Sequence, residues 1–154
     1  SSSQERECPE MLLDSISESE HNVIRGMHIQ IAQWQQITIL KGIVNDLMID
    51  LNPDSETYLK HYMQRLDSSG VNQLLISPGI AHGFQVLSDS AIMSYKSSKY
   101  YGETSEYVFN VSSPEIAPFF NLQNSIQSER DLLAPQLSEL LETQGFLQNI
   151  DGSS

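Results

Sequence analysis

The chain has 154 residues, of which 39% are hydrophobic, and its formal net charge is −12. This length fits one domain with its own core. No apolar run approaches the roughly 20 residues of a membrane-spanning helix, and residues 1–10 lack the apolar stretch of a signal peptide. We therefore expect a cytoplasmic protein without a membrane partner. The negative charge argues against nucleic acid as a partner, because phosphate binding needs clustered Lys and Arg; a few local cations could still hold a small anion.

The N-terminal segment, residues 1–22, is rich in Ser and Glu and contains one short apolar insert, Met11–Leu13. This composition predicts a flexible tail followed by a loop or an edge strand. Cys8 is the single cysteine of the chain. It has no partner for an intramolecular disulfide or a structural zinc site, which predicts a free thiol.

The segment Ile37–Leu51 is dense in β-branched residues, and Gly42 divides it as a hairpin turn or a bulge would. Asn52-Pro53-Asp54 then gives a clear turn signal. The next segment, Tyr58–Leu66, is ambiguous. Its apolar residues recur at helical spacing and fit the alternation of a strand less well, so periodicity alone favours a helix there.

Short strands separated by turns are predicted at residues 71–76, 83–87, 91–96 and 106–111. Strands at a spacing of roughly ten residues are typical of a sandwich or a barrel rather than of a parallel α/β sheet. Near the C-terminus, Ser128 can cap a short helix, and Gln136–Gln144 places three leucines on one helical face. We therefore divide the chain into a polar tail and edge segment (1–22), a β-barrel (23–127) and a helical segment packed on it (128–150).

Two histidines are predicted to face one pocket. His82 lies in Pro78–Phe84, where a proline-glycine turn leads into a strand, and His28 follows Arg25-Gly26-Met27. Arg25 and His28 would point to opposite faces of a regular strand unless Gly26 introduces a bulge. Taken alone, each histidine is better explained as a packed, hydrogen-bonded residue than as a catalytic one.

Tyr95 and Asp131 complete a set of groups that could carry acid–base chemistry. A histidine can accept a proton near neutral pH, and a tyrosine can return one. An aspartate behind the histidine would fix its tautomer and stabilise the cation that forms.

The order and spacing of four motifs, at residues 25–30, 78–84, 95–101 and 128–135, resemble the dTDP-4-dehydrorhamnose 3,5-epimerase family. The resemblance extends over residues 13–141 and implies an all-β cupin jelly-roll barrel with a short C-terminal helix. It makes the ambiguous segment, residues 58–66, a strand. It further implies a homodimer that works without metal or cofactor on a nucleotide-linked 4-keto-6-deoxyhexose. The family removes a proton next to the C4 ketone and returns one on the opposite face.

Carried over motif by motif, the resemblance makes His28 the base, Asp131 its partner and Tyr95 the acid. It also implies a set of substrate-binding residues: Arg25 at the diphosphate, His82 near the sugar or its enolate, Tyr101 on the nucleotide base, and Glu106 and Arg130 in contact with ligand.

Two departures from the family stand out. The lysine that helps to stabilise the enolate in the family is replaced by Gln35, a neutral amide that can donate a hydrogen bond but brings no charge. Lys41 is a less suitable substitute. The segment Leu13-Asp14-Ser15 matches a polar stretch of the family only in part, which leaves the nucleotide open.

Three interpretations follow. The protein is an epimerase acting at C3, C5 or both, with an open choice of nucleotide; or it binds a nucleotide sugar without turnover; or His28 and His82 are ligands of a metal cupin. The third is disfavoured, because a cupin metal site needs a His-x-His pair with a nearby Glu and Ile29-Gln30 follows His28. We expect the first.

Overall fold

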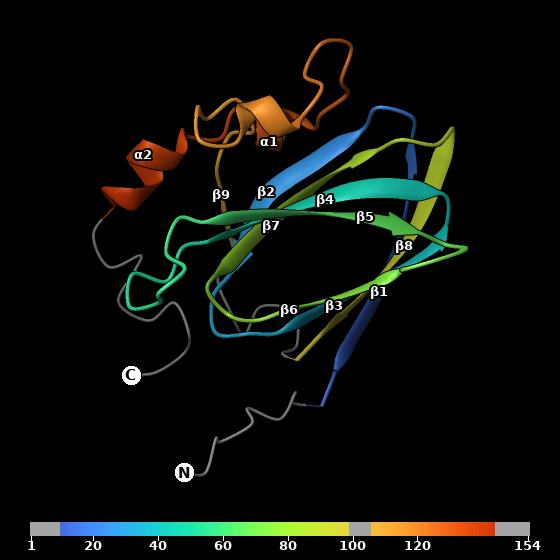
Figure 1. Cartoon of the computed structure of the whole chain (residues 1–154), viewed down its shortest axis with the longest axis horizontal. Coiled ribbons are helices and arrows are strands. Elements are labelled where there is room, and N and C mark those ends of the chain that lie inside the picture. Colours follow the sequence, from blue (N-terminus) through green and yellow to red (C-terminus); the bar gives the residue numbers. More distant parts are fainter. Residues whose placement is uncertain (1–9, 99–105, 144–154) are drawn as a thin grey trace.

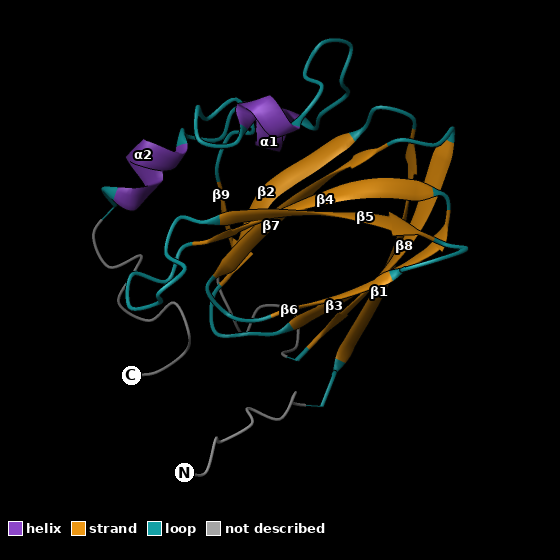
Figure 2. Cartoon of the chain, viewed as in Figure 1, coloured by secondary structure: helices purple, strands orange, loops and turns teal. Residues whose placement is uncertain are grey.

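The computed structural model describes residues 10–98 and 106–143 and consists mainly of two antiparallel β-sheets packed face to face (Figures 1 and 2). One sheet has four strands in the order β1-β8-β3-β6, and the other has five in the order β5-β4-β7-β2-β9. The strands in chain order are β1 (Leu13–Glu20), β2 (Ile24–Gln30), β3 (Gln35–Lys41), β4 (Ile43–Asp50), β5 (His61–Asp67), β6 (Gln73–Ile76), β7 (Ile80–Val86), β8 (Ser90–Ser97) and β9 (Glu106–Val108). This is the predicted all-β jelly roll.

One expectation about connectivity is wrong. Gly42, with φ 91°, was expected to form a hairpin turn or a bulge between the halves of Ile37–Leu51. The strands that it joins, β3 and β4, instead belong to opposite sheets, where β3 pairs with β6 and β8 and β4 pairs with β5 and β7. Gly42 therefore carries the chain from one layer of the sandwich to the other.

The ambiguous segment 58–66 forms strand β5, as the resemblance implied and against its helical periodicity. β5 is an edge strand, paired with β4 from Ile43↔Asp67 to Ile49↔His61. Tyr62, one of the residues that suggested a helical face, is 61% exposed, whereas Leu66 is fully buried. Pairing with β4 determines the conformation of this segment and overrides its weak helical spacing.

The helices are few and short: η1 (Ala117–Phe119), α1 (Glu129–Leu132) and α2 (Leu137–Leu141). Ser128 caps α1 as predicted, because its hydroxyl accepts a hydrogen bond from the Asp131 amide at 3.2 Å. Gln136 caps α2 with a capping box. Within residues 10–98 and 106–143, no helix is long and apolar enough to cross a membrane. The predicted division of the chain into three segments stays a prediction.

Strand residues of the five-stranded sheet alternate between its two faces, and both faces are covered by other parts of the chain. Its inner face meets the four-stranded sheet in one cluster that includes Ile37, Val44, Phe84, Val86 and Met93. Its outer face is covered by residues that follow β9, in a second cluster that includes Met27, Leu47, Ile49, Phe109, Val111, Ile116, Leu137 and Leu140. The chain after β9 therefore forms a third layer behind the five-stranded sheet, visible above and to the left of the sandwich in Figure 1.

Candidate active site

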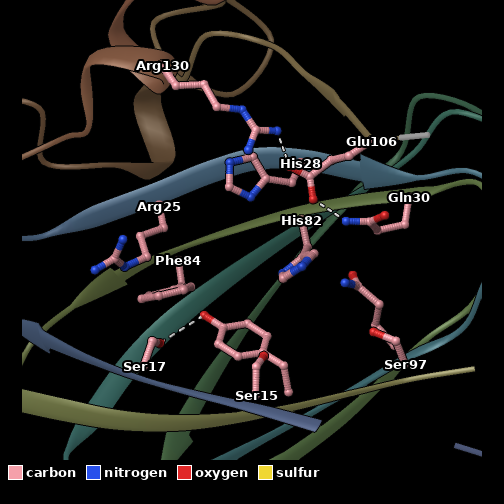
Figure 3. Close-up of a pocket in the computed structure, with 12 residues that line it drawn as sticks. Ser15, Ser17, Arg25, His28, Gln30, His82, Phe84, Ser97, Glu106 and Arg130 are labelled. Atoms are coloured by element: carbon pink, nitrogen blue, oxygen red, sulfur yellow. Dashed lines mark hydrogen bonds and ion pairs between the residues drawn. The ribbon is translucent and has the colours of Figure 1, made fainter. Parts of the chain in front are cut away.

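A cavity of about 330 Å³ opens between the two sheets (Figure 3). Its walls are the inward positions of the same strands that build the inner core. Seven of the nine predicted site residues line it: Arg25, His28, Gln35, His82, Tyr95, Glu106 and Arg130. An eighth, Asp131, lies directly behind His28, and the ninth, Tyr101, lies outside the residues that the structure describes.

A bulge in β2 brings Arg25 and His28 to one wall. The pairing of β2 with β7 runs Arg25↔Phe84 and then His28↔His82, so the register shifts between them, as expected if Gly26 interrupts the strand. Gly26 has φ +142°, and a Cβ built on it would lie 2.5 Å from the Cα of Gly83. The two backbones can approach this closely only because neither residue carries a side chain.

His28 and Asp131 form a hydrogen-bonded pair between strand β2 and helix α1. His28 Nε2 lies 2.9 Å from Asp131 Oδ1, and Asp131 Oδ2 accepts the Gly26 amide at 3.2 Å. Burial of Asp131 would raise the pKa of its carboxyl, but the hydrogen bond and charge of His28, the Gly26 amide and the charge of Arg130 together lower that pKa below its usual value. An ionised Asp131 that accepts the Nε2 proton leaves the lone pair of the imidazole on Nδ1, ready to take a proton.

A second histidine–aspartate pair, missed in the sequence, lies deeper in the barrel. His82 Nδ1 lies 3.2 Å from Asp46 Oδ2, His82 is 5% exposed and Asp46 is fully buried. Among the described residues, Asp46 Oδ1 has no hydrogen-bond partner. Burial raises the pKa of Asp46 and outweighs the opposing effect of His82. The alternation of Val44, Asp46 and Met48 put this carboxylate on an inward face, but the same pattern would also suit a solvent-facing aspartate.

Tyr95 stands on the opposite wall, on β8 of the four-stranded sheet. Its hydroxyl accepts a hydrogen bond from Ser17 of β1 at 3.5 Å, the dashed line that leaves Ser17 in Figure 3. Burial raises the pKa of Tyr95 to about 12, although Ser17 and Arg25 act in the opposite direction. Tyr95 is therefore a neutral phenol at physiological pH and can donate a proton.

The mouth of the cavity carries a polar network. Arg130 and Gln30 both hydrogen-bond to the carboxylate of Glu106, as Figure 3 shows. Arg25, further along β2, donates from Nε to the Ser19 hydroxyl at 2.9 Å. Arg25 and Arg130 are the two guanidinium groups among the described lining residues, and they suit an anionic ligand.

Gln35, the predicted replacement for a lysine, does line the cavity at the start of β3. Lys41, at the far end of that strand, is exposed and is not part of the lining. In the part of the chain that the structure describes, no three His, Cys, Asp or Glu side chains come together as metal ligands would.

A two-sheet jelly roll with a histidine–aspartate pair on one wall and a tyrosine on the other defines a cupin-type protein with groups suited to proton transfer. Comparison with known proteins specifies the family. The family model for dTDP-4-dehydrorhamnose 3,5-epimerase matches residues 2–139. The chain belongs to this family.

Three relatives illustrate the match. The chain is 33% identical over 126 residues to dTDP-4-dehydrorhamnose 3,5-epimerase from Shigella flexneri, covering 80% of this chain and 70% of that protein. It is 33% identical over 128 residues to dTDP-4-dehydrorhamnose 3-epimerase from Streptomyces niveus, covering 81% of this chain and 62% of that protein. The crystal structure of the 3,5-epimerase from Legionella pneumophila in complex with dTDP-4-keto-L-rhamnose has a TM-score of 0.76 at 31% identity, covering 84% of this chain and 71% of that one.

Proposed function

We propose that the protein epimerises a nucleotide-linked 4-keto-6-deoxyhexose at C3, C5 or both. The observation that carries this proposal is the placement of His28 and Tyr95 on opposite sheets, facing one cavity. Epimerisation removes a proton from one face of a carbon next to the ketone and returns a proton to the other, so it needs two distinct groups on opposite sides of the substrate.

In the first step, His28 takes the proton on Nδ1 while Asp131 holds Nε2–H and stabilises the imidazolium. The electron pair moves onto the C4 oxygen and gives an enolate, which hydrogen-bond donors on the inner walls stabilise. We assign this stabilisation to His82, held by Asp46, and to Gln35. In the second step, Tyr95 gives its proton to the carbon from the opposite wall. Arg25 and Arg130 hold the diphosphate, Glu106 orients Arg130, and Tyr101 stacks on the nucleotide base.

The ligand is supported by the relatives, which include a 3,5-epimerase structure with dTDP-4-keto-L-rhamnose and a 3-epimerase. Because both kinds of epimerase occur among them, the proposal covers one or two carbons. A dTDP-linked sugar is the first substrate to test, with CDP-, GDP- and UDP-linked sugars beside it. The complete acid–base set favours turnover over binding alone.

Deuterium wash-in tests the proposal. In deuterated water, the protein should incorporate deuterium at C3, C5 or both of the 4-keto sugar, and the labelled carbons identify which centres react. The His28→Asn variant should bind the sugar nucleotide and incorporate none. Saturable binding by the wild-type protein without any exchange, across all four nucleotides, would instead establish a non-catalytic binder.

We further propose a cytoplasmic homodimer. Support for the dimer comes from the outer face of the four-stranded sheet, where Ile16, Leu40 and Leu75 are 70%, 53% and 46% exposed, in contrast to the covered outer face of the five-stranded sheet. Sedimentation equilibrium at micromolar concentration should give twice the mass of the chain, and a monomer would contradict the dimer.

A further inference from the structure

Strand β1 carries three serines on its cavity side, from exposed Ser15 through half-buried Ser17 to buried Ser19. Ser15, Ser17 and Ser19 alternate with outward residues, of which Ile16 is 70% exposed. Ser15 and Ser17 line the cavity, and Ser19 accepts the hydrogen bond of Arg25. A core-facing strand ordinarily places apolar residues at its covered positions, so the hydroxyls of Ser17 and Ser19 are polar groups where packing alone would favour apolar ones.

Ser17 is the member of the row that reaches the predicted acid. β1 pairs with β8 so that Ser15 lies directly opposite Tyr95, while Ser17 lies opposite Met93 and diagonal to Tyr95. The diagonal neighbour, not the direct one, donates to the Tyr95 hydroxyl, at 3.5 Å. Hydrogen bonds of catalytic groups are often this long without substrate and shorten in the complex.

We propose that Ser17 is a positioning residue for the reaction, an inference that rests on the proposed epimerisation. Ser17 aims the Tyr95 hydroxyl at the substrate and returns a proton to the Tyr95 oxygen after each turnover. When Tyr95 protonates the enolate carbon, its O–H bond breaks, a C–H bond forms, and the negative charge moves to the phenolate oxygen. The Ser17 hydroxyl then passes its proton to that oxygen as it takes one from a water molecule, in one concerted relay, and the hydroxide that is left combines with the proton that His28 releases to solvent.

The location of Ser17 fits such a return path. The phenolate needs a rapid proton source, because burial makes Tyr95 a strong base once it is ionised. Ser17 is half-buried and belongs to β1, an edge strand of the four-stranded sheet. Its hydroxyl can both donate and accept. It therefore joins the buried phenol to the solvent side of the strand without adding a charge to the cavity.

The test measures how often the enolate goes on to epimerised product and how often it returns to substrate. In deuterated water, an enolate that Tyr95 protonates becomes epimerised product, whereas one that His28 re-protonates returns as deuterated but unepimerised substrate. Ser17→Ala should lower the ratio of epimerisation to exchange by about tenfold, the scale of one lost hydrogen bond. A loss of packing alone would lower both rates together and leave the ratio unchanged.

Two controls sharpen the result. Glu18→Gln changes an exposed residue on the outward face of β1, next to Ser17, and should keep the wild-type ratio. Ser17→Thr and Ser17→Val have nearly the same shape and suit a strand, so the ratio should be kept by Thr and lost by Val even if the alanine variant is unstable. An unchanged ratio in Ser17→Val, with exchange present in the wild type, overturns the role of Ser17 alone. Absence of exchange in the wild type overturns the proposed function, and this inference with it.

Discussion

Asp131 Oδ1 lies 2.9 Å from His28 Nε2, a hydrogen bond that joins helix α1 to a side chain on the cavity face of β2. His28 is the part of this pair that opens to the cavity, while Asp131 is 3% exposed. In the proposed mechanism the pair therefore has two roles: the imidazole meets the substrate, and the buried carboxylate sets its tautomer.

Asp131→Asn should lower the rate of deuterium exchange by about 10²–10⁴-fold, the range ascribed to a positioned acid–base group. An amide cannot stabilise the imidazolium, and it can hold the ring in the wrong tautomer. Single-turnover exchange measures this directly. Asp54→Asn, an exposed change in the loop after β4, is the matched control and should exchange at the wild-type rate. Wild-type exchange in Asp131→Asn would contradict the assigned partnership.

Asp131→Asn should also change how the free energy of unfolding depends on pH. The folded protein lowers the pKa of Asp131 below its unfolded value, so the ionised carboxylate stabilises the folded state above the unfolded pKa. This contribution is lost as the pH falls through the folded pKa. Wild type should be more stable than Asp131→Asn in urea at pH 7, and the difference should shrink at acid pH, below the usual carboxyl range. A difference that grows on acidification would contradict the shift.

Asp46 should behave in the opposite sense. Burial raises its pKa in the folded protein, so ionisation at higher pH costs folding free energy. Asp46→Asn removes this cost and should be more stable than wild type at pH 8, with little difference at pH 4. It should also exchange deuterium more slowly, because His82 loses its ionisable partner. Urea unfolding at both pH values measures the effect, and a less stable variant at pH 8 would refute it.

Gly83 should tolerate no side chain. A Cβ there would meet Met27 Sδ at 2.7 Å and the Arg25 carbonyl oxygen at 3.0 Å. Gly83→Ala should therefore cost about 2–4 kcal/mol of stability and reduce activity in the molecules that remain folded, because it pushes against the β2 bulge. Gly70→Ala is the matched control, since a Cβ there approaches nothing closer than 4.0 Å. Its free energy of unfolding should stay within about 0.5 kcal/mol of wild type.

Gln35→Lys should raise the rate of deuterium exchange by roughly tenfold. Gln35 already lines the cavity, and a cation at this position would stabilise the enolate more strongly than a neutral amide does. Gln35→Met, which is similar in length but neither charged nor a donor, should lower the rate. If the lysine variant exchanges no faster than wild type, Gln35 does not act on the enolate.

Much of the fold follows from local signals. Most strands could be predicted because turn residues bound them, and the Ser128 cap could be predicted because capping depends on neighbouring residues. The connectivity of the strands could not be predicted in this way. The crossing of the chain at Gly42 depends on which partners β3 and β4 find elsewhere, and no residue near Gly42 encodes that choice. Segment 58–66 was misleading for the same reason, since pairing with β4 overrides its own periodicity.

The candidate site shows the same difference between residues in local motifs and residues placed by long-range pairing. His28, Tyr95 and Asp131 could be named because each lies in a motif of the family. Asp46 was missed because its role depends on pairing across the sheet, where β4 and β7 bring it beside His82. The serines of β1 were missed because a segment rich in Ser and Glu has the composition of a disordered tail. Only the ladder with β8 reveals that one face of this segment is the wall of the cavity.

The third layer behind the five-stranded sheet has a consequence for partial unfolding. Asp131 lies in α1, within the same stretch that covers Leu47 and Ile49 with Phe109 and Leu137. Native proteins open locally, in cooperative segments, at free energies below that of global unfolding. When this stretch detaches, it withdraws the carboxylate from His28 and uncovers apolar surface in one event. In the proposed mechanism, molecules that have begun to unfold from this side would therefore lose activity before the two sheets separate.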